Sequence, residues 1–140
     1  MTRDDIHALL DRRNAAWRAR DPSALAALHD LNGVVVSPTG GVLEGRAEIE
    51  RVYRVWFHAF PDLVTQADTL IDGDRAVQVL QFSGTHSGEF FSLPATNRHV
   101  EVTVACVMTL RDGRVLEERR IYDFTGLLVQ VGVLKAKPQA

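Results

Sequence analysis

The sequence has only one cysteine, Cys106, among its 140 residues. A single cysteine excludes an intrachain disulfide and any zinc site built from several cysteines. No apolar stretch approaches the roughly 18 residues that a membrane-spanning helix needs. The N-terminal run MTRDDIHALLDRR also lacks the apolar segment of a secretion signal. We therefore expect a cytoplasmic protein that does not associate with a membrane.

Charge of one sign is not concentrated anywhere in the chain. The 16 Lys and Arg residues face 18 Asp and Glu residues, which gives a net charge of −2. The densest basic pairs are Arg12-Arg13 and Arg119-Arg120, so we expect no nucleic-acid partner. The five histidines show no H-x-H or H-E-x-x-H spacing, and we expect no metal site.

The chain has enough apolar residues, 46% of the total, to form one domain with a sizeable core. Residues 1–140 are predicted to form that domain, with 135–140 as a frayed tail. Apolar periodicity predicts helices over 2–20, just after Asp21-Pro22, and over 46–60. Strands are predicted in GVVVSP and over 63–71, 75–91, 98–111 and 114–124, with hairpin turns at DGD and RDGR. Helices followed by a long antiparallel meander indicate an α+β fold with helices against one face of a curved sheet.

Asp123 is an isolated carboxylate in the run RRIYDFTGLL. If residues 112–113 form a two-residue turn, Val102 lies opposite Asp123, and Arg119 shares their largely apolar face. Burial there would raise the pKa of Asp123 and suit it to act as a general acid or base. Alternatively, Asp123 caps a short helix that begins near Phe124. A β-bulge would reverse part of this register.

Three further polar residues are candidates for a site. His86, in GTHSGEF, is either a pocket donor and proton partner for Asp123 or a rim residue that bonds a loop. Gln81 is a candidate for orienting a substrate carbonyl, or a solvated residue. Arg119 is either a clamp for a substrate carboxylate or enolate, or an ion-pair partner of Glu117.

Aromatic residues are expected to form the apolar wall of a pocket, with most of them in the core and two or three touching a ligand. They are Trp17, Tyr53, Trp56, Phe60, Phe82, Phe90 and Phe91.

Several stretches together resemble, in order and spacing, the SnoaL-like polyketide cyclase or ester cyclase family of the nuclear transport factor 2-like superfamily. They are WRARDPSALAALHD, GVLEGRAEIERVY, AFPDL, GTHSGEFFSLPATNR and RDGRVLEERRIYDFTGLLVQVG. The resemblance implies a cone-shaped, cystatin-like α+β barrel, in which three helices from the N-terminal half wrap a curved antiparallel sheet around a deep pocket. Cyclases of this family close a ring of a polyketide methyl ester by intramolecular aldol condensation, without a metal or cofactor. Their general acid/base is an Asp near the end of the last strand, which Asp123 matches, and His86 falls where the family pattern has a His.

The leading hypothesis is thus a cofactor-independent, cyclase-like enzyme acting on a small apolar carbonyl compound. The alternatives are an isomerase or epoxide hydrolase, and a non-catalytic ligand-binding protein. The strand at 102–110, VTVACVMTL, has no His or Gln and favours the binding protein. We also expect a homodimer through the sheet. The alternate face of the last hairpin combines Thr103, Ala105, Val107 and Thr109 with Leu116, Glu118, Arg120 and Tyr122, which is typical of an interface with a polar rim.

Overall fold

The computed structural model describes residues 1–135, and the predicted tail lies outside that range from residue 136 onward. Four helices and six strands follow in chain order. They are α1 (Arg3–Ala19), α2 (Pro22–Ala27), β1 (His29–Ser37), β2 (Gly41–Glu44), α3 (Arg46–Ala59), β3 (Val64–Asp72), β4 (Arg75–Thr85), β5 (His99–Arg111), β6 (Arg114–Ile121) and α4 (Phe124–Gln130).

The first two helices begin where their capping residues predict. Thr2 and Asp5 form a reciprocal capping box at the start of α1. The carboxylate of Asp21 accepts a 3.0 Å hydrogen bond from the backbone N–H of Ala24, with Pro22 at the first helical position of α2. The three N-terminal helices are therefore confirmed, within a few residues at their ends.

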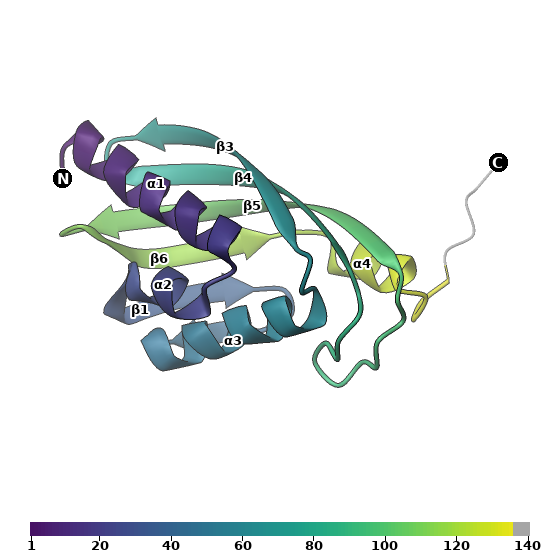
Figure 1. The fold of residues 1–140 in the computed structure, drawn as a ribbon. Coiled ribbons are helices and arrows are strands. Elements are labelled where there is room, and N and C mark those ends of the chain that lie inside the picture. The colour runs from purple at the N-terminus through teal and green to yellow at the C-terminus, as the bar shows by residue number, and fades with distance from the viewer. Residues whose placement is uncertain (136–140) are drawn as a thin grey trace.

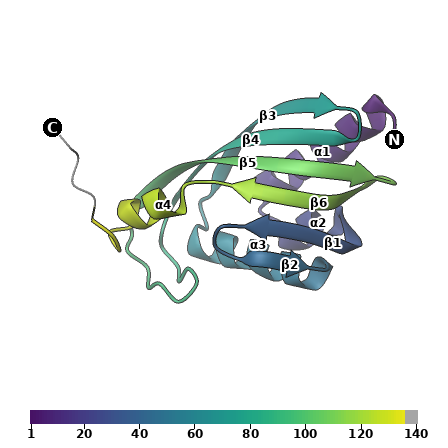
Figure 2. The ribbon, with the colours of Figure 1, turned by 180° about the vertical axis from the view of Figure 1, so that it is seen from behind.

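The six strands form one curved sheet in the order β2-β1-β6-β5-β4-β3. All neighbouring pairs are antiparallel except β1 and β6, which are parallel. Helices α1, α2 and α3 lie against one face, and α4 lies at the end of the sheet where β6 ends (Figure 1). The opposite face carries none of the helices of residues 1–135 (Figure 2). The predicted α+β architecture is confirmed.

Strand β4 ends at Thr85, six residues earlier than predicted. The backbone N–H groups of Ser87 and Gly88 both donate to the carbonyl of Ala59, at 3.1 Å, instead of to a neighbouring strand. A Cβ atom at Gly88 would come within 2.1 Å of the His58 carbonyl oxygen, so this close approach requires glycine. The segment 86–98 is consequently a loop tied to the end of α3. A second difference is β2, a strand that is absent from the predicted set.

The β5–β6 hairpin differs from its predicted register because β6 contains a bulge. Arg111 pairs with Arg114 as predicted, but Leu116 is an extra residue without a partner in β5. Beyond it, Cys106 pairs with Arg120 rather than with Arg119. Because side chains alternate along a strand, the bulge exchanges the two faces of β6 from residue 117 onward.

The core lies between the helices and the inner face of the sheet. A large cluster around α3 contains most of the aromatic residues, and a smaller one joins Ile6, Leu9 and Leu10 of α1 to the far ends of β4, β5 and β6. None of the described helices is both long and apolar enough to span a bilayer.

Candidate functional site

A narrow cavity of about 30 Å³ opens between α1, α3 and the inner face of the sheet. Its size leaves room for about two water molecules. The cavity is lined mainly by aromatic and aliphatic side chains, with a few polar groups. The lining residues are Trp17, Ser37, Tyr53, Trp56, Leu80, Phe82, Val104, Cys106, Arg120 and Tyr122.

Four of the seven aromatic residues predicted for the pocket wall line this cavity, and Phe60, Phe90 and Phe91 do not. Trp56 occupies the centre of the aromatic cluster, with its ring 5.3 Å from Phe82 and 5.7 Å from Tyr122. Phe60 stacks against Trp56 at 5.9 Å. Its side chain supports the ring of Trp56 and does not reach the cavity.

A buried ion network lies next to the cavity. Glu118 receives a 2.9 Å hydrogen bond from Arg13 Nη1 and a 2.5 Å hydrogen bond from Arg120 Nε, and all three side chains are almost completely buried. The guanidinium of Arg120 also lies 4.6 Å from the centre of the Tyr53 ring, a cation–π geometry. Glu118 and Arg120 reach this network because the bulge turns them inward.

Neutral polar groups surround the network. Arg13 Nε donates to Gln78 Oε1 at 3.0 Å, and Gln78 Nε2 donates in turn to Asn14 at 3.0 Å. His29 Nε2 lies 3.4 Å from the Tyr53 hydroxyl and 3.9 Å from Glu118. These contacts fix the positions of the Arg13 and Glu118 side chains relative to each other.

The charges of the network follow from burial and from ion pairing. Burial alone would raise the pKa of Glu118, but Arg120 and Arg13 together lower that pKa far below the ordinary value. Burial lowers the pKa of His29 to about 3, so its imidazole is neutral at pH 7. Burial raises the pKa of the Cys106 thiol to about 11 and also raises the pKa of Tyr53. Both of those groups are neutral as well.

Two buried hydrogen-bond donors on cavity-lining side chains have no partner among residues 1–135. They are Nη2 of Arg120 and the indole N–H of Trp17. Leaving a buried donor unsatisfied costs about 1–3 kcal/mol, and more when the group is charged. An oxygen acceptor in the cavity would remove this cost.

Asp123 is not buried on the inner face, and this position corrects the prediction. It is exposed, and its Oδ1 accepts a 2.8 Å hydrogen bond from the backbone N–H of Gly126, so Asp123 is the N-cap of α4. A Cβ atom at residue 126 would lie 2.3 Å from Asp123 Oδ2, so a side chain there would displace this carboxylate from its capping position. The bulge brings Tyr122 to the cavity wall in its place.

His86 is buried but does not line the cavity. Its Nδ1 lies 3.0 Å from the Thr96 hydroxyl, and its backbone bonds both Arg98 and Asn97 across loop 86–98. Burial lowers the pKa of His86, which keeps the ring neutral beside Phe60, 5.6 Å away. The hydrogen bonds of His86 therefore tie the loop together and do not go to Asp123.

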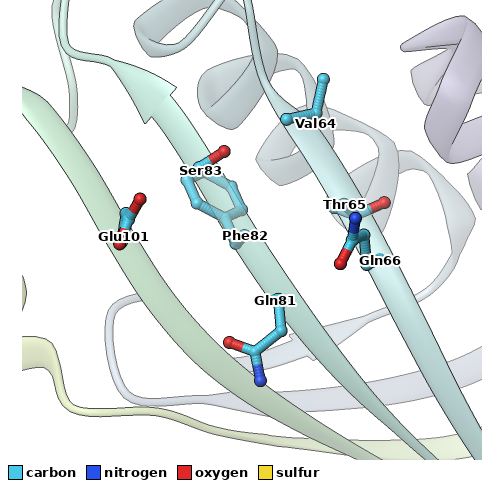
Figure 3. Close-up of a pocket in the computed structure, with 7 residues that line it drawn as sticks. All are labelled: Val64, Thr65, Gln66, Gln81, Phe82, Ser83 and Glu101. Atoms are coloured by element: carbon cyan, nitrogen blue, oxygen red, sulfur yellow. The ribbon is translucent and has the colours of Figure 1, made fainter.

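Arg119 and Gln81 lie on the outer face of the sheet, so neither is in a position to bind a ligand in the cavity. Both are exposed, and Gln81 Oε1 accepts a 2.9 Å hydrogen bond from Thr103. Figure 3 shows Gln81 in a separate, shallow hollow of about 260 Å³ formed by β3, β4 and β5. The inward-facing glutamine of β4 is Gln78, which is completely buried.

Sequence reasoning did not identify Arg13, Gln78 or His29. Arg13 falls on the apolar stripe of α1, seven residues after Ile6, so its burial could have been predicted from the sequence. Gln78 shares the buried alternation of β4 with Leu80, which was also visible. No sequence pattern identifies His29, because its burial depends on Tyr53 and Glu118 from distant elements.

A curved sheet with helices on one face and an aromatic cavity between them is typical of the nuclear transport factor 2-like, or ketosteroid isomerase-like, fold. Structures from Burkholderia pseudomallei and Catenulispora acidiphila share this fold at TM-scores of 0.77 and 0.75. The chain matches the SnoaL-like polyketide cyclase family over residues 7–131, and it belongs to that family.

Solved structures agree with this assignment. AclR from Streptomyces galilaeus, a proposed hydroxylase, is 24% identical, with a TM-score of 0.85 over 99% of this chain and 91% of its own. TsrD from Streptomyces laurentii is 26% identical, with a TM-score of 0.82 over 96% of this chain and 99% of its own. IdmH from Streptomyces antibioticus, a proposed polyketide cyclase, is 27% identical, with a TM-score of 0.75 over 90% of this chain and 97% of its own.

Curated proteins gave no match. Within residues 1–135, no group of three or more His, Cys, Asp or Glu side chains is placed to hold a metal ion.

Proposed function

We propose that this protein is a cyclase-type enzyme that binds a small, largely apolar carbonyl compound in the aromatic cavity. Membership of the SnoaL-like polyketide cyclase family supports the reaction class. The observation that carries the proposal is Nη2 of Arg120, which is buried on a mainly apolar cavity wall and has no hydrogen-bond partner among residues 1–135. The proposed reaction is carbon–carbon bond formation or a related proton transfer next to a carbonyl group.

Arg120 is proposed to stabilise the negative charge that develops on the carbonyl oxygen as an enolate forms. A preorganised donor in a water-poor site typically contributes about 3–4 kcal/mol to such a step. Glu118 holds the guanidinium through Nε at 2.5 Å, which leaves Nη2 free for the ligand. Trp17 would supply a second donor to the same oxygen.

Asp123 is proposed as the group that moves the proton, because it matches the family's acid/base position and directly follows the cavity-lining Tyr122. Only its Oδ1 is engaged, by Gly126, so Oδ2 is left to accept a proton. Exchange of the methyl protons of an aryl methyl ketone in D₂O, followed by NMR, tests this role without the natural substrate. Asp123→Asn should slow exchange by roughly 10²–10⁴-fold.

The stabilities of two Asp123 variants distinguish a catalytic role of Asp123 from its role as a helix cap. Asparagine caps helices about as well as aspartate, so Asp123→Asn should unfold at nearly the wild-type denaturant concentration. Asp123→Ala removes the cap and should cost about 1 kcal/mol. Unchanged exchange in the Asn variant would show that Asp123 is only a cap.

A second candidate function is a non-catalytic binding protein of the same fold. The observation in its favour is that, within residues 1–135, the residues that line the cavity include no carboxylate and no histidine. Ligand binding without proton exchange in the wild-type protein would support it and reject the enzyme.

We also propose a homodimer through the outer face of the sheet. Because of the bulge, the side chains of Glu118 and Arg120 point inward and are not part of the predicted interface. The outer face instead combines the half-buried Val107 and the exposed Ile121 with Arg119. Sedimentation of the wild-type protein at micromolar concentration should give the mass of two chains, and a mass of one chain would reject the dimer.

A further inference from the structure

The buried network carries more positive than negative charge. Arg13 and Arg120 are both ionised, and Glu118 is the one carboxylate within residues 1–135 that is bonded to either. His29 and the other titratable groups of the network are neutral, as derived above. Arg46, whose Nε donates to the His29 carbonyl at 2.7 Å, adds further positive charge at the edge. Without a ligand, one positive charge of the network has no counter-charge.

This excess charge is accessible only through Arg120. Both Arg13 and Arg120 have an Nη2 without a partner among residues 1–135, but Arg13 does not line the cavity. An unpaired buried charge is costly, and a hydrogen bond from a guanidinium to a carboxylate is stronger than one to a neutral carbonyl oxygen. The cavity therefore favours an anion over a neutral carbonyl compound.

We propose that the ligand of this cavity carries a permanent carboxylate, which binds Nη2 of Arg120 and the indole N–H of Trp17. This inference rests on the proposed function and narrows its substrate class to an apolar acid. It assigns Arg120 and Trp17 to binding the carboxylate, in place of the enolate oxygen. The rings of Trp56 and Phe82 form the adjoining apolar wall. The cavity in this state has room for the acid group alone, so the remainder of the ligand must displace part of the lining. Tyr122 is the half-buried lining residue, held by a hydrogen bond to Thr39.

Benzoate, methyl benzoate and a phenol that is ionised at the working pH test the charge of the ligand. Binding is measured by ligand-observed NMR with the full-length protein. Benzoate should bind about 10- to 100-fold more tightly than its ester, as expected for hydrogen bonds to a charged group. Equal binding of acid and ester would overturn the inference. A preference for the phenolate alone would assign the charge to an enolate and would also overturn it.

Arg120→Met should abolish the preference for the acid, because Arg13 and Glu118 then form a neutral pair. The matched control is Arg119→Met, one residue away on the exposed outer face, which should keep the full preference. Loss of preference in both variants would contradict the assignment to Arg120.

Trp17→Phe keeps the ion network intact and keeps the test available if Arg120→Met fails to fold. It should weaken benzoate binding by about 2- to 10-fold, the equivalent of one hydrogen bond. Trp56→Phe is its control, since the Trp56 indole N–H is not among the unpartnered buried donors, and it should change acid and ester binding by the same factor. If the ester binds as tightly as the acid, the proposed function stands and only this inference is refuted. Failure of every probe refutes both.

Discussion

Glu118→Gln should destabilise the protein more than any surface substitution, because it removes the carboxylate of the buried ion network. The side chain of Glu118 is completely buried and lies 2.9 Å from Arg13 and 2.5 Å from Arg120. Glutamine keeps the shape and one hydrogen-bond acceptor, but it leaves two buried guanidinium groups without a counter-charge. Breaking a buried pair in this way typically costs about 3–5 kcal/mol.

This loss is large against the total stability of a domain, which is about 5–15 kcal/mol. For a chain of this length it corresponds to a fall in Tm of roughly 10–20 °C. Urea unfolding followed by circular dichroism measures the free energy directly. Glu117→Gln is the matched control on the exposed face of the same strand, and it should change stability by less than about 0.5 kcal/mol. Equal effects of the two substitutions would refute the bulged register and the network with it.

Two shorter predictions concern the same core. Burial lowers the pKa of His29 from 6.5 to about 3, so between these values the unfolded chain binds a proton that the folded chain does not. The free energy of unfolding should therefore fall as the pH drops below about 6.5, by at most about 1.4 kcal/mol per pH unit. His29→Gln should flatten this slope between pH 6 and pH 5, where an unchanged slope would count against a neutral His29. Trp56→Ala should cost about 3–5 kcal/mol in urea unfolding, because its ring packs against Phe82 and, at 4.7 Å, Phe90. A cost below 1 kcal/mol would show that the Trp56 side chain contributes little to the packing of the core.

The fold was predictable because its signals are local and repeated. Capping residues at Thr2 and Asp21, the apolar stripe of α3 and the Asp-Gly turns each specify a boundary within a few residues. The end of β4 was not predictable in this way. It depends on the Ala59 carbonyl at the end of α3, which takes the hydrogen bonds of Ser87 and Gly88.

The candidate site was predictable only in its apolar part. Trp17, Tyr53 and Trp56 fall on helix stripes, so their burial follows from periodicity. The polar part depends on partners far apart in the sequence, such as the hydrogen bond of Arg13 to Glu118. A charged residue on an apolar stripe indicates that a buried partner exists, but the stripe does not say which residue it is.

The bulge at Leu116 accounts for three of the corrections together. One extra residue turns Arg119 outward, brings Tyr122 to the cavity and leaves Asp123 exposed as a helix cap. A bulge of this kind has no strong sequence signal, since any side chain can occupy the unpaired position when the strand bends.

The run EERR at 117–120 explains why an acid and an arginine face inward although the residues differ from those predicted. Either register places one Glu and one Arg, two residues apart, on the inner face of β6. The sequence therefore predicts an inward acid–arginine pair whichever way the strand is paired, and only the hairpin register selects Glu118 and Arg120. Asp123 has no such duplicate beside it, so the same shift moves it out of the core. This asymmetry makes Arg120 the stronger basis for a function, and it makes the proton-transfer role of Asp123 the part of the proposal that most needs the Asn variant.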